Sequence, residues 1–178
     1  MPRRPSSLDI FTDGAAFRNG RWDAKGGWAF VYEMNGNLVQ RKGHIPFGKQ
    51  SNNLSEFQGI LEGIKHAYSE KIYNITIGTD SQYAINSLTK WFWKWRKNGW
   101  KTSYGTDVKN REIIETIRSW MKAIDDQGGN VRLKHVPGHG TNELNNLADS
   151  LAKKAALENP IYDYSKYRKF RKMAKQLL

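Results

Sequence analysis

The spacing of apolar residues along the 178-residue chain alternates between two kinds of period, and their order limits the fold most strongly. Alternation of apolar and polar residues is typical of strands, and apolar spacings of three and four are typical of one helix face. The chain is expected to form three strands, a helix, a strand, two helical regions, a strand and a helix. In that order, the segments are Leu8–Thr12, Trp28–Glu33, Leu38–His44, Leu54–Tyr68, Ile75–Thr79, Gln82–Leu88, Ile113–Ile124, Val131–Val136 and Leu144–Ala155.

This order predicts an α/β domain with a mixed five-stranded sheet flanked by helices. Asn35-Gly36 is typical of a hairpin turn, so the first three strands are expected to form an antiparallel meander. The later strands are joined through helices, as parallel neighbours require. Asn159-Pro160 marks a junction, because proline ends a helix. We therefore expect a short tail over residues 1–7, one domain over 8–158 and a basic amphipathic extension over 159–178.

Composition excludes several classes of site. The chain has no cysteine, which excludes a disulfide framework, a thiol nucleophile and a cysteine-ligated zinc ion. No apolar run approaches the roughly 20 residues of a membrane-spanning helix, so no membrane partner is expected. The formal net charge of +12 predicts a polyanionic partner and favours nucleic acid over a membrane surface. Because no targeting signal is recognised, a cytoplasmic location is expected.

Acidic residues are few in this basic chain, and four of them fall beside predicted strand ends or apolar helix stripes. Asp13 closes the first predicted strand, and Asp80 closes the fourth. If these strands are parallel neighbours, both carboxylates project from the sheet edge where α/β folds bind ligands. Glu56 and Asp149 lie beside apolar helix stripes and could join them. Clustered carboxylates repel one another without a cation, and magnesium takes oxygen ligands, although a single strand-end aspartate is more often a turn residue.

Eight short motifs occur in an order that resembles one protein family. They are Phe11-Thr12-Asp13-Gly14, Asn19-Gly20, Gly26-Gly27-Trp28, Ser51-Asn52-Asn53-Leu54-Ser55-Glu56, Thr79-Asp80-Ser81, Lys97-Asn98-Gly99-Trp100-Lys101-Thr102, Val136-Pro137-Gly138-His139 and Asn145-Asn146-Leu147-Ala148-Asp149. The set resembles type 1 ribonuclease H, which cuts the RNA strand of RNA–DNA hybrids. The resemblance covers about residues 8–157 and implies the ribonuclease H-like fold.

The resemblance also implies a reaction and its partners. It implies endonucleolytic hydrolysis of the RNA strand with little sequence specificity, leaving 5′-phosphate and 3′-hydroxyl ends. The implied cofactors are two Mg²⁺ ions per site, with Mn²⁺ as a substitute. The implied partner is an RNA–DNA hybrid. A monomer is expected, and no protein partner is inferred.

Particular residues take roles from the resemblance. Asp13, Glu56, Asp80 and Asp149 match the four catalytic, metal-binding carboxylates, and His139 matches a mobile histidine that assists proton transfer or product release. The residues that match RNA-strand contacts are Asn19, Asn52, Asn53 and Glu56. The residues that match contacts to the DNA strand and its phosphates are Lys49, Ser51, Tyr83, Trp91, Trp95, Arg96, Lys97, Lys101, Ser103 and Asn110. Many relatives have arginine in place of Lys49, and lysine lacks the planar fork of arginine.

The segment from Trp91 to Lys101 contains four tryptophans and four cations, and it resembles the basic protrusion of the family. One or two of the rings are expected in the core. The remaining rings are expected to pack on sugars, while the cations neutralise phosphates.

Other interpretations stay open at this point. The chain could be a ribonuclease H domain of a viral or retroelement polyprotein, or another nuclease or recombinase with the same sheet and acids. It could also be an inactive hybrid-binding module. The extension is expected either to pack on the domain as an amphipathic helix or to act as a hybrid-binding arm.

Overall fold

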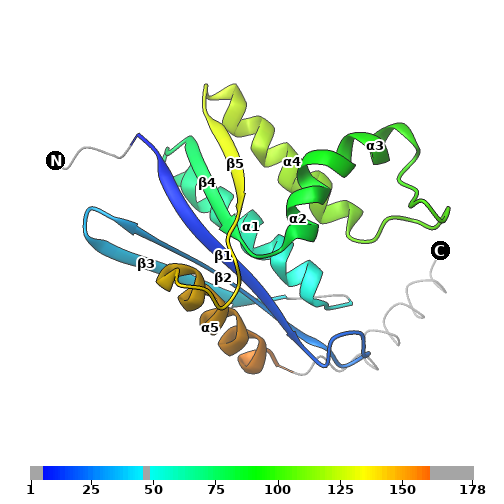
Figure 1. The fold of residues 1–178 in the computed structure, drawn as a ribbon, viewed down its shortest axis with the longest axis horizontal. Helices are drawn as coiled ribbons and strands as arrows, with labels where there is room; N and C mark the ends of the chain where they lie inside the picture. Colours follow the sequence, from blue (N-terminus) through cyan, green and yellow to red (C-terminus); the bar gives the residue numbers. More distant parts are fainter. Residues whose placement is uncertain (1–5, 46–48, 161–178) are drawn as a thin grey trace, which may run out of the picture.

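The structure, a computed structural model, describes residues 6–45 and 49–160 (Figure 1). Its strands are β1 (Leu8–Phe17), β2 (Lys25–Met34), β3 (Asn37–His44), β4 (Asn74–Thr79) and β5 (Asn130–His135). Its helices are α1 (Asn52–Ser69), α2 (Gln82–Asn86), the π-helical turn η1 (Ser87–Trp91), α3 (Phe92–Lys97), α4 (Arg111–Asp126) and α5 (Glu143–Glu158). None of the described helices combines the length and apolar character needed to cross a membrane.

The five strands form one mixed sheet in the order β3-β2-β1-β4-β5. The pairs β1–β2 and β2–β3 are antiparallel, whereas β1–β4 and β4–β5 are parallel. The predicted α/β fold, with an antiparallel meander followed by parallel strands, is thus confirmed. Asn35 and Gly36 connect β2 to β3 with φ angles of 53° and 75°, the left-handed conformation that a tight hairpin turn requires.

β1 is longer than its sequence pattern predicts. The apolar alternation ends at Thr12, but the strand continues to Phe17 because its antiparallel pairing with β2 extends to that residue. Parallel pairing with β4 stops earlier, at Phe11. The prediction that Asp13 closes the first strand is therefore wrong. Asp13 lies within β1, two residues beyond the last pair with β4, where that side of the strand becomes free.

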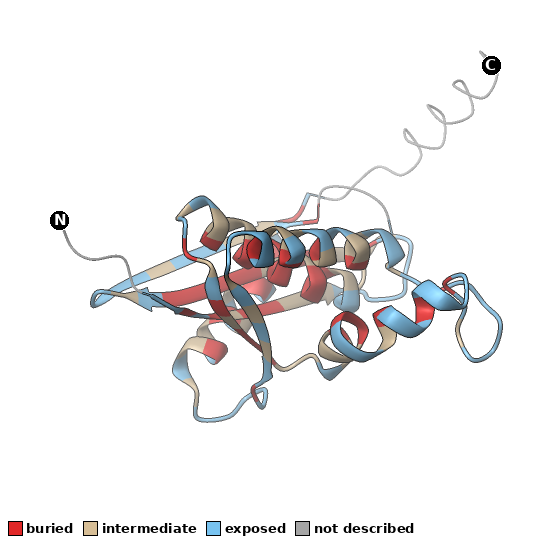
Figure 2. Ribbon diagram, turned by 90° about the horizontal axis from the view of Figure 1, so that it is seen from above, coloured by how far each residue is buried: buried red, intermediate tan, exposed pale blue. Residues whose placement is uncertain are grey.

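Helices cover the two sheet faces in different places. α1 packs on β1 and β2, with α4 beside it, whereas α5 packs on β1, β2 and β3. Figure 2 shows buried residues, in red, concentrated between the sheet and these helices. Ile10, Ile60, Ile64 and Ile77 are fully buried in this core. The core therefore packs along β1, the strand that contributes Asp13.

The domain boundary lies later than predicted. Asn159, assigned from sequence to the extension, is only 1% exposed and caps the end of α5. Its Nδ2 donates hydrogen bonds of 2.8 Å to the Gly26 carbonyl and to Gln50 Oε1. These bonds join the end of α5 to the start of β2 and to the segment before α1. Asn159 therefore belongs to the domain, while the predicted extension from residue 161 and the tail over residues 1–5 lie outside the described residues.

Candidate active site

Three carboxylates from three elements meet at the edge of the sheet. Asp13 comes from β1, Glu56 from the first turns of α1 and Asp80 from the residue after β4. Each offers one oxygen, and these oxygens lie within 4.8 Å of one another. Ser51 caps α1 by accepting a 3.2 Å hydrogen bond from the Leu54 amide, which fixes where the helix begins. The position of Glu56 is thereby set by the helix start.

Close packing of β1 against α1 brings Asp13 beside Glu56. A Cβ atom at Gly14 would lie 2.1 Å from the Glu56 nitrogen and 2.1 Å from the Ser55 carbonyl carbon. Only glycine fits at this crossing. The missing side chain at Gly14 therefore lets β1 and α1 approach closely enough to bring Asp13 and Glu56 together.

Burial dominates the electrostatics of the site. The pKa of Asp13 is raised to about 7, first by burial and then by the charges of Asp80 and Asp149. Burial also raises the pKa of Glu56 well above its ordinary value, and the charge of Asp13 adds to the effect. Among the described residues, buried Glu56 Oε2 has no hydrogen-bond partner. A cluster of carboxylates with an unpartnered buried oxygen fits a divalent cation that takes oxygen ligands.

Asp149 brings a fourth carboxylate to the site from α5. Its charge opposes ionisation of Asp13, and its Oδ2 accepts a 2.7 Å hydrogen bond from Lys153 Nζ one helical turn later. The structure therefore brings together all four acids that the sequence singled out. Their catalytic role stays a prediction.

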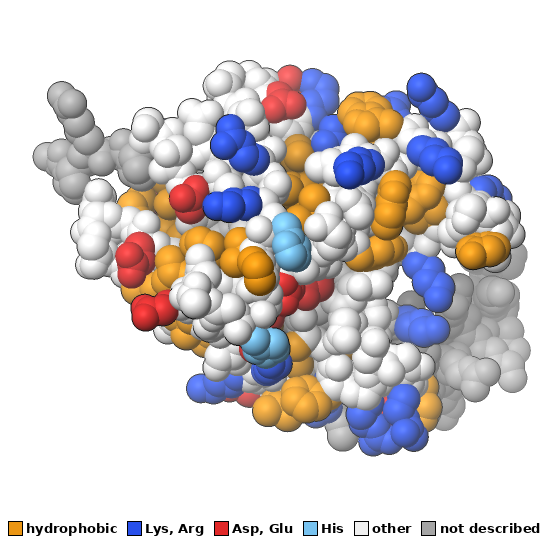
Figure 3. Space-filling model, viewed as in Figure 1, with side chains coloured by type: hydrophobic (Ala, Val, Ile, Leu, Met, Phe, Trp, Pro, Cys, Tyr) orange, Lys and Arg blue, Asp and Glu red, His pale blue; other side chains and the backbone are white. Residues whose placement is uncertain are grey.

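The loop between β5 and α5 passes directly over Asp80. A Cβ atom at Gly138 would collide with the Asp80 carboxylate, so the backbone at this point lies against the acid. The next residue, His139, is exposed and has a φ of 53°. Figure 3 shows histidine side chains, in pale blue, flanking the red acids at the centre of this face. The loop thus puts the predicted proton-transfer residue at the rim of the acid cluster.

A pocket of about 560 Å³ opens between the β1–β2 loop, the start of α1, α2 and the start of α4. It is lined by Asn19, Gly20, Lys49, Gln50, Ser51, Asn52, Asn53, Tyr83, Lys109 and Asn110. The predicted RNA-side asparagines and four of the predicted DNA-side residues therefore share one pocket. Lys109 and Gln50 were missed from sequence. Lys109 could have been found from sequence because it is a cation directly before Asn110, a predicted phosphate contact.

Two asparagines hold the pocket wall together. Asn52 Oδ1 accepts a 2.7 Å hydrogen bond from the Ala16 amide, and Asn19 Oδ1 accepts a 3.1 Å bond from the Asn52 amide. Both bonds use carbonyl oxygens. Within the described part of the chain, the two NH₂ groups have no hydrogen-bond partner, so they can donate to a ligand. Asn110 begins α4 with a left-handed φ of 62°, a conformation that asparagine adopts more readily than most residues.

A sequence model of the RNase H family matches residues 5–157. The chain belongs to the ribonuclease H family. It is 33% identical over 153 residues to mouse ribonuclease H1, covering 86% of this chain and 51% of that protein. It is 35% identical over 145 residues to ribonuclease H of Caldicellulosiruptor saccharolyticus, covering 81% of this chain and 92% of that protein. The chain thus spans about half the length of its mammalian relatives and most of the bacterial one.

Solved structures of ribonuclease H proteins share the fold. RNase H1 from the halophilic archaeon Halobacterium salinarum matches with a TM-score of 0.56 and 20% identity, covering 84% of this chain and 96% of that one. The foamy viral protease-reverse transcriptase in complex with RNA/DNA hybrid matches with a TM-score of 0.66 and 22% identity. That match covers 88% of this chain and 21% of the viral one. The predicted ribonuclease H-like fold is confirmed.

The Trp-rich segment from Trp91 to Lys101 divides between core and surface. Trp95 and Trp100 are buried, with exposed fractions of 9% and 5%, which confirms that one or two rings lie in the core. Trp91 is partly buried, and its ring lies 5.8 Å from that of Tyr83 and 5.7 Å from that of Trp95. Trp95 matches a DNA-strand contact in the family, but its ring packs between Trp91 and Trp100 and leaves little surface for a ligand. Its contact with DNA stays a prediction. Trp93, to which the sequence analysis assigned no binding role, is 50% exposed.

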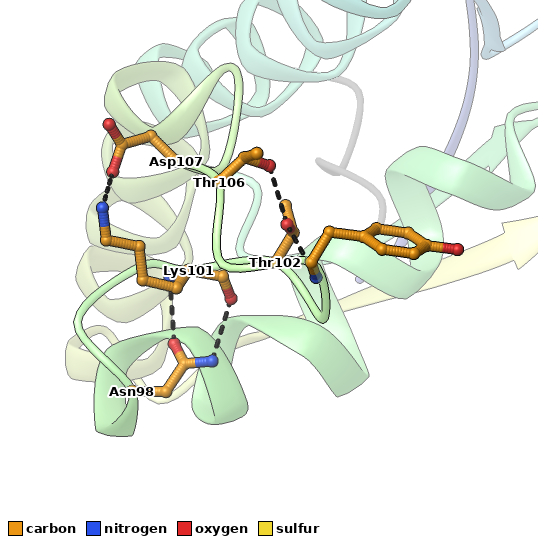
Figure 4. Close-up of polar contacts among 6 residues, drawn as sticks. Asn98, Lys101, Thr102, Thr106 and Asp107 are labelled. Carbon is orange, nitrogen blue, oxygen red and sulfur yellow. Dashed lines mark hydrogen bonds and ion pairs between the residues drawn. The ribbon is translucent and has the colours of Figure 1, made fainter.

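Lys101 lies in a short loop after α3 whose polar contacts fix its shape (Figure 4). Asn98 Nδ2 donates a 2.9 Å hydrogen bond to the Lys101 carbonyl, and Asn98 Oδ1 accepts a 3.2 Å bond from the Lys101 amide. The Lys101 Nζ lies 2.5 Å from Asp107 Oδ1. This ion pair lowers the pKa of Asp107, first by the hydrogen bond and then by charge. The predicted phosphate-binding charge of Lys101 is therefore partly neutralised by an acid.

The other predicted phosphate contacts of this region lie on its surface. Arg96, Lys97 and Ser103 are exposed. The Arg96 guanidinium lies 5.7 Å from the Phe92 ring centre and 5.8 Å from that of Trp93. These aromatic faces support the cation while leaving it accessible to phosphate.

Proposed function

We propose that the protein is an endoribonuclease that hydrolyses the RNA strand of RNA–DNA hybrids. The observation that carries this proposal is the convergence of Asp13, Glu56 and Asp80 within 4.8 Å, with Asp149 beside Asp13. Membership of the ribonuclease H family supports it. So does the similarity in fold to a viral enzyme solved with an RNA/DNA hybrid. A cluster of costly buried acids is a poor binding surface for phosphate unless metal is bound, which favours catalysis over passive binding.

The four acids would hold the metal. Their donors are oxygens only, and the unpartnered Glu56 Oε2 marks a coordination position. This donor set suits two Mg²⁺ ions, with Mn²⁺ as a substitute. When bound, such ions supply electrostatic stabilisation of the attacking and leaving oxygens in a phosphoryl displacement.

The protein's own residues then position the substrate and move a proton. Asn19, Asn52 and Asn53 can donate to and accept from the 2′-hydroxyl groups that distinguish RNA from DNA. Lys49 and Lys109 line the same pocket and can neutralise phosphates of the DNA strand. Carried beside Asp80 by its loop, His139 can deliver a proton to the leaving 3′-oxygen or assist product release. The products are a 3′-hydroxyl and a 5′-phosphate.

Cleavage of labelled duplexes tests the proposal. An RNA–DNA hybrid, a DNA duplex and an RNA duplex are incubated with Mg²⁺, with Mn²⁺ or with EDTA. We expect cuts only in the RNA strand of the hybrid, and only with metal. Asp80→Asn should lose cleavage and keep most hybrid binding, while Asp126→Asn on the exposed end of α4 serves as the matched control. An intact hybrid after incubation with wild-type protein and metal overturns the function. Full activity of Asp80→Asn overturns the site.

A further inference from the structure

A second groove lies on the sheet beside α5, and the proposed function does not use it. The groove has a volume of about 410 Å³ and lies over β1, β4 and β5, whereas α5 packs on β1, β2 and β3. Its lining includes Asp9, Phe11, Gly78, Arg132, Lys134 and Pro137. The described helices therefore leave this part of the sheet accessible to a ligand.

The groove has an apolar floor and a basic side. Gly78 has no side chain, and it lies so close to Phe11 that a Cβ atom would sit 2.8 Å from the ring. Arg132 and Lys134 are both exposed on β5. They lie two residues apart on one face of the strand, which separates them by about 7 Å. Neither takes part in the ion pairs formed among residues 6–45 and 49–160.

The groove continues from the acid cluster. Pro137 lines it, and the next residue, Gly138, lies against Asp80. The only acid in its lining, Asp9, is opposite Thr76 in the β1–β4 pairing, at the end away from Asp80. Figure 3 shows Lys and Arg side chains on both sides of the central acids, over β5 as well as over the helical region that contains α3. The positive charge on this face thus extends past the acids in both directions.

We propose that this groove binds the RNA strand of the substrate beyond the scissile phosphate, with Lys134 and Arg132 against successive phosphates. Phe11 offers an apolar surface for a sugar or base between them. The inference rests on the proposed function, because the acids define where the scissile phosphate lies. A polyanionic strand matches two unpaired cations at this spacing, and continuity with the acids favours the substrate strand over a separate acidic peptide.

The salt dependence of hybrid binding tests this groove. Arg132→Gln and Lys134→Gln are combined in the Asp80→Asn protein, which binds without cutting. The matched control carries Lys122→Gln, an exposed lysine on α4 that is paired with Asp126. Loss of two phosphate contacts should reduce the slope of log affinity against log salt by about 2 and weaken binding about tenfold at low salt. A hybrid whose RNA ends at the cleavage site should bind both variants equally.

The outcomes separate the groove from the proposed function. With Asp80 intact, the double variant should need a higher hybrid concentration than the Lys122→Gln control to reach half of its maximal cleavage rate. If the double variant has the same salt slope and affinity as the Lys122→Gln control, the groove does not bind RNA, and the proposed function is unaffected. The groove is also overturned as an RNA site if the double variant loses binding to polyglutamate but keeps binding to the long hybrid. Failure of the wild-type protein to cut any hybrid overturns the function itself.

Discussion

Replacement of Asp13 by asparagine is expected to stabilise the metal-free protein at neutral pH. The Asp13 side chain is 6% exposed, and its ionised form is opposed first by burial and then by the charges of Asp80 and Asp149. Asparagine has nearly the same shape and carries no charge. It also leaves the backbone pairing of β1 with β2 unchanged, so the main effect is removal of an unfavourable charge.

The magnitude follows from the pKa of Asp13, which is raised from 3.8 to about 7. At about 1.4 kcal/mol per pKa unit, ionising this carboxyl in the folded protein costs about 4 kcal/mol. The folded state holds this proton more tightly than the unfolded state, so the wild-type protein loses stability as pH rises from about 4 to about 7. The advantage of Asp13→Asn is therefore absent below pH 4 and complete above pH 7. For a domain of this size it corresponds to a rise in Tm of about 8–16 °C.

Urea and thermal unfolding at pH 4 and pH 8 in EDTA measure this difference. Asp9→Asn changes an exposed acid on the same strand and is the control. Excess Mg²⁺ should narrow the gap, because a cation that binds the folded wild-type cluster stabilises it selectively. If Asp13→Asn is no more stable than Asp9→Asn at pH 8, or if its advantage is equal at both pH values, the pKa of Asp13 is not raised by its surroundings.

Four further predictions concern other parts of the molecule. Asp107→Asn should free Lys101 and tighten hybrid binding about two- to threefold at low salt, measured by fluorescence anisotropy; unchanged affinity would mean that Lys101 does not contact phosphate. Gly14→Ala should destabilise the fold by about 3 kcal/mol in urea unfolding because its Cβ overlaps the α1 backbone, and a wild-type midpoint would contradict this packing. Burial lowers the pKa of His66, so the contribution of His66 to stability is lost as pH drops below 6.5, opposite in sign to the contribution of Asp13. The stability of His66→Gln relative to the wild-type protein should therefore rise as pH drops below 6.5, and a constant difference in urea unfolding would contradict this. Deletion of residues 160–178 should weaken hybrid binding and flatten its salt dependence more than it lowers the saturated cleavage rate, and equal affinity at low and moderate salt would exclude a binding arm.

The sheet could be predicted from sequence because strand and helix periods differ along most of the chain. The end of β1 could not, because Ala15 and Ala16 carry no strand pattern and are held only by distant pairing with β2. The proximity of Asp13 and Asp80 followed from the predicted parallel pairing of β1 with β4. The positions of Glu56 and Asp149 depend on how α1 and α5 pack on the sheet, and periodicity alone does not specify this packing.

The orientation of the tryptophans was harder to predict. Trp91, Trp93 and Trp95 alternate with other residues in a way that does not show which rings turn inward. In the helix, Trp91 and Trp95 are four residues apart and lie on one face, with ring centres 5.7 Å apart. Trp93 lies on the other side and is exposed. Lys109 was missed because it lies between the predicted helices, where no periodicity indicates which residues line a pocket.

The uninterrupted run of β1 through Asp13 restricts how the protein can be engineered. Side chains alternate between sheet faces, so inserting one residue between Ile10 and Asp13 would turn the aspartate toward the opposite face. The segment from Arg18 to Ala24 lies between β1 and β2 and has no partner in the sheet register. A peptide tag placed in that loop would leave the acids in position. A single-residue insertion between Ile10 and Asp13 would instead separate Asp13 from the other acids.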